Sequence, residues 1–306
     1  VLGIIATKLR LSAIVGYLLA GIILGPQTPG FVGDYAMAAE FAEVGVVLLM
    51  FGVGLHFKLK DLLAVKRVAV TLRKLPAGLS GFRIVQLTDI HIGPTIDGRW
   101  LRQVVAQVNA LNPDVIAITG DLVDGSVANL REHVAPIGEL RARHGVYFVT
   151  GNHEYFYRGD EWCAALRDLG LRVLTDQHQL IEHEGARVLL IGLNDEEAAP
   201  ASPRPTVLAR LLATAPPAEL RVLLAHRPSD LQLTTDQKID VQLSGHLHGG
   251  QFFPLTLLVK WLEPFLAGLY RVGELWLYVN RGAGYWGPPN RLGARQEITL
   301  LELVSG

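Results

Sequence analysis

The sequence predicts an α/β (α+β) protein with two mixed β-sheets and helices outside them, preceded by an N-terminal helical hairpin that crosses a membrane. Two observations lead to this prediction. The first 67 residues consist largely of apolar, glycine-containing runs, and from residue 83 onwards apolar strand-like runs alternate with helical segments before closely spaced strands follow. Such an order of elements is typical of sheets covered by helices.

The composition limits the classes of protein to consider. Hydrophobic residues make up 50% of the 306 residues, and the mean hydropathy of +0.29 exceeds that of an ordinary soluble enzyme. A formal net charge of −1 provides no basic field for nucleic acid, so no nucleic-acid-binding surface is expected. The single cysteine, Cys163, excludes an internal disulfide, and any metal site must therefore use His, Asp, Glu or Asn.

Two apolar runs, 11–25 and 41–57, predict the membrane hairpin, although each is slightly shorter than the roughly 20 residues that span a bilayer. The loop between them lacks Lys and Arg, whereas basic residues flank both runs. The positive-inside rule then places both flanks and the rest of the chain on the cytoplasmic side of the inner membrane. A buried helical hairpin of a soluble fold is the alternative. The basic residues are Lys8, Arg10, Lys58, Lys60, Lys66 and Arg67.

Residues 68–82 contain Pro and Gly and predict a linker, so the second domain is expected to cover 83–306. We expect helices over 97–111, 127–143 and 161–169. The expected strands are 83–88, 114–119, 146–150, 172–174, 186–193, 220–225, 241–244, 275–279 and 297–303.

Residues that can bind metals follow five of these strands at the point where each strand ends. Carboxyl ends of strands in open α/β sheets gather at one edge, where ligands bind. His and carboxylate groups without sulfur suit Mn, Fe or Zn, and two such ions about 3.5–4 Å apart can clamp a phosphoryl group. Each residue alone also fits a turn or helix cap. The clusters are Asp89 and His91, Asp121, Asn152 to Glu154, His226, and His246 and His248; most of the other five histidines are expected at the surface.

The ordered series resembles the calcineurin-like metallophosphoesterases from Arg83 to the C-terminus. This resemblance implies a four-layer αββα sandwich and a binuclear metal-dependent hydrolase. A finer similarity to bacterial membrane-associated phosphodiesterases rests on 86–88 and 284–289. The matching motifs are Asp89-x-His91, Gly120-Asp121-x-x-Asp124, Gly151-Asn152-His153-Glu154, His226 and Gly245-His246-x-His248.

The resemblance also implies a role for each matching residue. Two divalent ions (Mn, Fe or Zn) would activate a hydroxide, and His153 would be the catalytic residue beside the scissile phosphate. Asp124 and Glu154 would orient the ligands, or else serve as turn and cap residues. One ion would be held by Asp89, His91, Asp121 and His248, and the other by Asp121, Asn152, His226 and His246.

The first 67 residues resemble the N-terminal part of monovalent cation:proton antiporters, through 8–26 and 43–55. Two helices cannot enclose a transport site at the membrane midplane. We therefore interpret this segment as a membrane anchor or as the remnant of a gene fusion.

The expected function is hydrolysis of a phosphate ester by a membrane-tethered phosphodiesterase. The resemblance to the bacterial phosphodiesterases implies a lipid- or nucleotide-linked ester as one candidate substrate, such as UDP-2,3-diacylglucosamine. The alternatives are a component of a cation:proton antiporter with a fused phosphoesterase domain, and a catalytically inactive binding module.

The apolar stretch 251–266 predicts a lid or membrane-dipping loop, or else a packed insertion over the sheet. The sequence carries no signal for the oligomeric state.

Overall fold

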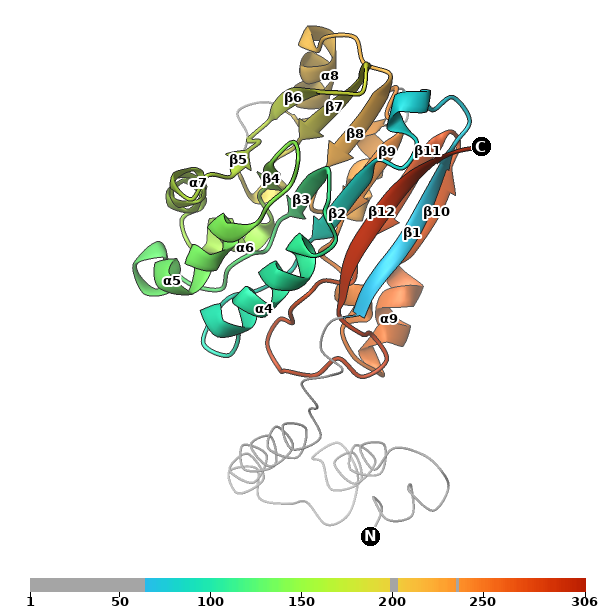
Figure 1. Cartoon of the computed structure of the whole chain (residues 1–306). Helices are drawn as coiled ribbons and strands as arrows, with labels where there is room; N and C mark the ends of the chain where they lie inside the picture. The colour runs from blue at the N-terminus through green and yellow to red at the C-terminus, as the bar shows by residue number, and fades with distance from the viewer. Residues whose placement is uncertain (1–63, 199–202, 235–236) are drawn as a thin grey trace, which may run out of the picture. The chain divides into compact units, whose positions relative to one another are not determined.

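The computed structural model describes residues 64–198, 203–234 and 237–306 (Figure 1). The expected transmembrane hairpin lies outside these residues. Among the described residues, no helix is both long enough and apolar enough to cross a membrane.

Six strands form the first sheet in the order β1-β12-β2-β3-β4-β5. The strands from β2 to β5 run parallel, β12 is antiparallel to β2, and β1 is parallel to β12 at the edge. The sheet is therefore mixed. Its strands are β1 (Ala64–Leu72), β2 (Arg83–Leu87), β3 (Val115–Thr119), β4 (Val146–Val149), β5 (Arg172–Val173) and β12 (Glu297–Ser305).

The second sheet also has six strands, in the order β10-β11-β9-β8-β7-β6. Its four inner strands run parallel, and both edge strands are antiparallel to their neighbours. Its strands are β6 (Gln177–His183), β7 (Ala186–Gly192), β8 (Leu220–Leu224), β9 (Val241–Ser244), β10 (Gly268–Val272) and β11 (Leu275–Val279).

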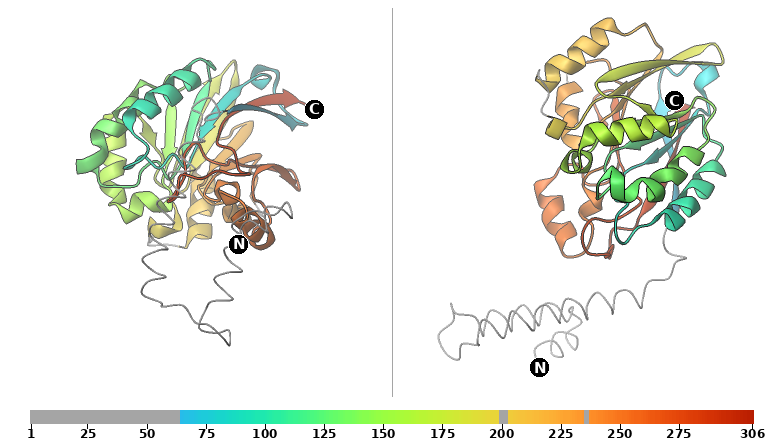
Figure 2. Two further views of the ribbon diagram at one scale, coloured as in Figure 1. Left: turned by 90° about the horizontal axis from the view of Figure 1, so that it is seen from below. Right: turned by 90° about the vertical axis from the view of Figure 1, so that its left-hand side faces the viewer.

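Strand residues pack alternately on the two faces of each sheet. In β2, Ile84 lies in the core between the two sheets and Val85 lies under the helices on the outer face. Because both faces of each sheet are covered by other elements, the parallel strands are almost continuously apolar. This pattern allowed their prediction from the sequence. The helices are α4 (Gly98–Asn109), α5 (Val127–Val134) and α7 (Gly159–Asp168) outside the first sheet, and α8 (Arg204–Thr214) outside the second. The layers are thus helix, sheet, sheet and helix (Figure 2).

The expected helices differ from the observed ones at their ends. Asp97 caps α4 by accepting the backbone N–H groups of Arg99 and Trp100, which explains where this helix begins. The helix expected over 127–143 instead ends at Val134 and continues as a 3-10 turn, Ala135–Glu139, that contains Pro136. Proline has no backbone N–H to continue an α-helix. The short helices α6 (Asn152–Phe156) and α9 (Leu255–Leu262) follow strand ends.

The linker expected over 68–82 is in part a strand. All nine residues of β1 pair with β12, from Ala64 opposite Glu297 to Leu72 opposite Ser305. The Pro and Gly residues that suggested a linker come only after this strand. As an edge strand with two adjacent basic residues, Lys66 and Arg67, β1 lacks the continuous apolar pattern of the inner strands, yet Val70 is buried in the core between the sheets.

Val70 offers a test of whether β1 belongs to the cooperative fold. Val70→Ala is expected to lower the free energy of unfolding by about 2 kcal/mol, because it removes buried methyl groups. The matched control is Val272→Ala on the exposed edge strand β10, where the expected change is below about 0.5 kcal/mol. Urea denaturation measures both values. Equal midpoints for Val70→Ala and the wild type would show that β1 does not contribute to the core.

Candidate metal centre

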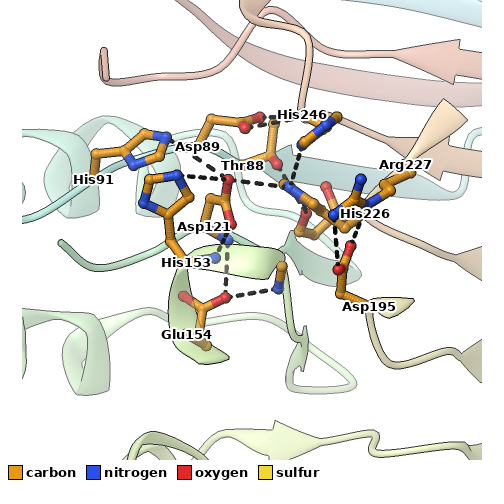
Figure 3. A network of polar contacts seen from close by, with 12 residues as sticks. Thr88, Asp89, His91, Asp121, His153, Glu154, Asp195, His226, Arg227 and His246 are labelled. Carbon is orange, nitrogen blue, oxygen red and sulfur yellow. Dashed lines mark hydrogen bonds and ion pairs between the residues drawn. The ribbon is translucent and has the colours of Figure 1, made fainter. Parts of the chain in front are cut away.

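The residues predicted from the strand ends lie together at one edge of the two sheets (Figure 3). The first sheet supplies them after β2, β3 and β4, and the second sheet supplies them after β8 and β9. The carboxyl ends of parallel strands from both sheets therefore meet at a common site. These residues are Asp89, His91, Asp121, Asn152, His153, His226, His246 and His248, all buried except the half-buried His246.

Asp121 lies between two groups of histidines. Its Oδ2 atom is 3.1 Å from His226 Nε2 on one side and 3.9 Å from His91 Nε2 on the other. Its Oδ1 atom accepts the backbone N–H of His153 at 2.9 Å. One carboxylate oxygen, Oδ2, therefore lies between the two groups of histidines, while the other oxygen, Oδ1, is held by a backbone hydrogen bond.

In each group, ring nitrogens of histidines converge. His91 Nε2 lies 3.0 Å from His248 Nε2, and His248 Nε2 lies 3.5 Å from Asp89 Oδ1. In the second group, His246 Nδ1 lies 3.1 Å from His226 Nε2. Imidazole nitrogens and carboxylate oxygens that point at a common position form a ligand set for a divalent transition metal or zinc.

An orphaned polar atom supports the same conclusion. The amide oxygen Oδ1 of Asn152 is buried and has no hydrogen-bond partner in the protein. Leaving a buried acceptor unsatisfied costs about 1–3 kcal/mol, and a bound cation would supply the missing partner. The residues at this edge thus fit two divalent ions on either side of Asp121.

The backbone at the site adopts an uncommon conformation. Five of the ten described non-glycine residues with positive φ lie here, with φ between 50° and 71°. A left-handed conformation of this kind costs about 1–3 kcal/mol per residue and concentrates at functional sites. It turns the chain sharply as each strand ends. The five residues are Asp89, His91, Asp121, His246 and His248.

Two glycines are required by the close approach of the loops. A Cβ atom on Gly151 would collide with Oδ1 of Asp121, and one on Gly245 would collide with Oδ2 of Asp89. Both positions precede ligand-bearing segments, which explains the Gly-Asn and Gly-His pairs in the sequence.

The buried ionisable groups strongly perturb one another. Burial would raise the pKa of Asp121, but the charge and hydrogen bond of His226, together with His91 and His153, leave this pKa well below its usual range. Burial would lower the pKa of His226, but Asp121 raises it to about 10. A metal bound by His226 would have to displace the proton of this ring, so its affinity would depend on pH. By contrast, burial and then His226 lower the pKa of His246 to about 3.

Asp124 and Glu154 hold other groups in place. Asp124 Oδ1 lies 3.0 Å from His91 Nδ1 and 2.5 Å from His153 Nδ1, so it fixes the orientation of both rings. Glu154 accepts three backbone N–H groups, those of Gly151, Asp121 and Leu122, at 2.6–3.0 Å. It therefore ties the loop after β3 to the loop after β4.

Two arginines hold the surroundings of the site together. Arg291, in the Gly- and Pro-rich C-terminal tail, donates a 3.1 Å hydrogen bond to the carbonyl oxygen of His248. Arg227 forms an ion pair with the buried Asp195 at 2.8 Å beside His226 (Figure 3). Both contacts join segments that are distant in the sequence.

Two exposed aromatic side chains flank His153. The ring centroid of Phe156 is 5.1 Å from that of His153, and the centroid of Trp286 is 6.2 Å away. Phe156 is 59% exposed and Trp286 is 56% exposed. Exposed aromatic rings beside a buried polar site are available to contact a substrate.

This arrangement is typical of binuclear metal-dependent hydrolases. The family model described as calcineurin-like phosphoesterase matches residues 82–250, and the chain belongs to this family. A transmembrane protein with a metallophosphoesterase domain from Danio rerio is 39% identical over 245 residues, which are 77% of this chain and 56% of that protein. The metallophosphoesterase YkuE of Bacillus subtilis is 31% identical over 76% of this chain and 82% of its own length.

The chain spans 56–57% of the length of its vertebrate relatives from Danio rerio and Bos taurus. Among solved structures, the NAD nucleotidase of Haemophilus influenzae is 15% identical with a TM-score of 0.50, covering 66% of this chain and 45% of that chain. This similarity concerns the fold alone.

The N-terminal segment gives a separate match. The family model described as sodium/hydrogen exchanger, transmembrane, matches residues 1–80. The Escherichia coli protein YbaL, named as a cation/proton antiporter, is 66% identical over 70 residues, which are 23% of this chain and 12% of YbaL. Both resemblances seen in the sequence are confirmed.

The shared hydrogen-bonding role of Asp124 predicts the effect of its substitution. Asp124→Asn is expected to weaken metal binding about 10- to 100-fold, because His91 and His153 both lose their carboxylate partner. The control is Asp160→Asn on the exposed surface of α7, for which no change is expected. Titration with MnCl2 followed by calorimetry measures both affinities. Unchanged affinity in Asp124→Asn would show that Asp124 does not orient a ligand.

Proposed function

We propose that the chain is a binuclear metal-dependent phosphoesterase, and specifically a phosphodiesterase. The single observation that carries this proposal is the Oδ2 atom of Asp121, which is faced by histidines from both sheets. When bound, two divalent ions would polarise phosphoryl oxygens and lower the pKa of a coordinated water. We assign one ion to Asp89, His91, Asp121 and His248, and the other to Asp121, Asn152, His226 and His246.

His153 is proposed to act on the substrate itself. Its Nδ1 faces Asp124, while its Nε2 lies 4.0 Å from Asp121 Oδ2 at the edge of the ligand cluster. Burial lowers the pKa of His153, but the hydrogen bond to Asp124 and the charge of Asp121 outweigh this effect and raise the pKa. A protonated ring so placed can donate through Nε2 to a phosphoryl oxygen or to the leaving group.

The helix α9 supports a lipid-linked substrate. None of its residues is buried: Trp261 is 82% exposed, Leu262 61% and Leu257 60%. The helix contains no acidic residue, and it packs against the turn His248–Gly250 that carries one of the proposed ligands. A large exposed apolar surface beside a catalytic site is typical of proteins that bind membrane lipid.

The topology of the first sheet gives further support. Because β1 is parallel to β12, and β12 is antiparallel to β2, β1 begins at the edge where β2 ends in the metal centre. A membrane-anchoring segment before Ala64 would therefore join the domain at the same edge as α9. We propose that α9 inserts into lipid and that the substrate is a lipid-linked phosphodiester, UDP-2,3-diacylglucosamine being one such ester.

The membrane is proposed to be the inner membrane, with the catalytic domain on its cytoplasmic side. The basic residues that flank the two apolar runs of the N-terminal segment support this orientation. A component of a cation:proton antiporter is the second candidate function, because residues 1–80 match an exchanger family. Metal-independent, proton-coupled cation flux into vesicles that contain the full chain would favour it.

Hydrolysis of a chromogenic bis-aryl phosphate by the Mn-loaded full chain tests the proposed activity. A chelator is expected to abolish hydrolysis, and added MnCl2 to restore it. His153→Gln is expected to lower kcat about 100-fold while the bound metal stays unchanged. Asp121→Asn should lower the affinity for both ions. The control is His178→Gln on β6, away from the centre; full activity of His153→Gln would contradict the assigned role.

Substitution of Trp261 tests the role of α9. Trp261→Asp is expected to lower binding to phospholipid vesicles at least about tenfold, because a charge replaces a large apolar contact. Hydrolysis of the soluble bis-aryl phosphate should not change. Trp261→Leu keeps the apolar character and serves as the matched control. Equal vesicle binding by Trp261→Asp and the wild type would exclude α9 as the lipid contact.

A further inference from the structure

A second cluster of potential ligands lies at the opposite edge of the sheets. Asp114 immediately precedes β3, His144 lies two residues before β4, and His183 is the last residue of β6. Since β3 and β4 end at the metal centre, their beginnings lie at the far edge. The cluster joins the first sheet, through Asp114 and His144, to the second sheet, through His183.

The three side chains converge as those of the catalytic centre do. His144 Nε2 lies 2.8 Å from His183 Nδ1, and His183 Nδ1 lies 3.9 Å from Asp114 Oδ1. Zinc bonds of about 2.0–2.2 Å in a tetrahedron separate the ligand atoms by about 3.3 Å, a value between these two distances. Side-chain movements of about half an ångström would therefore complete the site.

The surrounding protein already orients each side chain. Asp114 Oδ2 accepts the backbone N–H of Arg83 at 2.8 Å, which leaves Oδ1 towards His183. The ring of Phe82 packs against His183 and His144, with centroids 4.8 and 6.2 Å apart. Ligands of structural metals are commonly held by neighbours in this way.

Burial, His183, Arg143 and Arg172 lower the pKa of His144, whereas the charge of Asp114 raises it, so nearby charges of both signs act on a cation at this position. Arg143 is paired with Glu184 at 3.3 Å, and Arg172 donates to the hydroxyl of Tyr147 at 2.6 Å. The same Glu184 lies 3.8 Å from His183 Nε2, the ring nitrogen that faces away from His144. His183 is only 6% exposed, whereas Asp114 and His144 are half-buried and leave an approach from solvent.

We infer that Asp114, His144 and His183 bind one zinc ion that joins the two sheets and is separate from the catalytic metals. Two imidazoles and one carboxylate supply three tetrahedral ligands, and water completes the fourth position. The alternative is a pair of neutral histidines that share a hydrogen bond and bind no metal.

Zinc content distinguishes the two explanations. The full chain is dialysed against ZnCl2 and the bound zinc per chain is measured. His144→Gln and His183→Gln are expected to lose one equivalent relative to the wild type and to keep the hydrolysis rate within about twofold. The matched control, His178→Gln on the same strand as His183, should lose none. Equal zinc content in the wild type, His144→Gln and His183→Gln would overturn the inference.

A direct measurement on the wild type covers the case in which these variants fail to fold. Crystals soaked in ZnCl2 should show an anomalous peak, at the zinc absorption edge, between Asp114 Oδ1, His144 Nε2 and His183 Nδ1. Absence of this peak, with peaks present at Asp121, would also overturn the inference. Neither measurement depends on the proposed hydrolysis, so the two proposals can fail separately.

Discussion

The position of one oxygen atom, Oδ2 of Asp121, determines what the centre can do. The other oxygen of the carboxylate accepts the backbone N–H of His153, and the backbone N–H of Asp121 itself donates to Glu154. The carboxylate thus has little freedom to rotate. His91 and His226 approach Oδ2 from loops that belong to different sheets, so the two sheets must pack in a fixed register for the site to exist.

This geometry has an energetic cost that the rest of the fold offsets. Five strained backbone conformations cost about 1–3 kcal/mol each, and several ionisable groups are buried beside one another. Three apolar clusters, one between the sheets and one outside each sheet, supply the opposing burial. The unfavourable backbone conformations and the buried ionisable groups therefore concentrate at the metal centre, as is common at functional sites of natural proteins. Bound cations would relieve part of this cost by neutralising Asp89 and Asp121.

The sequence predicted the parts of the fold that are buried on both faces. The inner strands could be predicted because they are continuous apolar runs, and the residues around Asp121 could be predicted because they follow these strands directly. The edge strands β1, β6 and β10 were not visible, because half-exposed strands carry charged and polar residues. Arg291 reaches His248 from a tail with no regular pattern, so only tertiary packing reveals this contact.

The cluster of Asp114, His144 and His183 could not be predicted from the sequence, for a different reason. Asp114 and His144 precede strands and His183 ends one, without an informative spacing. Most histidines outside the strand-end motifs are expected at the surface, but His183 is buried. The residues that we propose as ligands of the catalytic metals follow strands at their carboxyl ends, where a motif can be recognised. Asp114 and His144 precede strands, and they meet His183 only because the second sheet packs against the first.

The strand β1 constrains how the two matched regions of the chain are joined. The exchanger model extends to residue 80 and the phosphoesterase model begins at residue 82, yet β1 pairs with β12 from Ala64 onwards. The folded phosphoesterase domain therefore includes residues that the exchanger model also covers. Glu297, opposite Ala64, accepts from the hydroxyl of Tyr278 and from the backbone N–H of Arg281. Arg281 precedes Gly282, where an added Cβ atom would collide with Asp89. Whatever precedes β1 is thus attached beside the metal centre, at the edge that also carries α9.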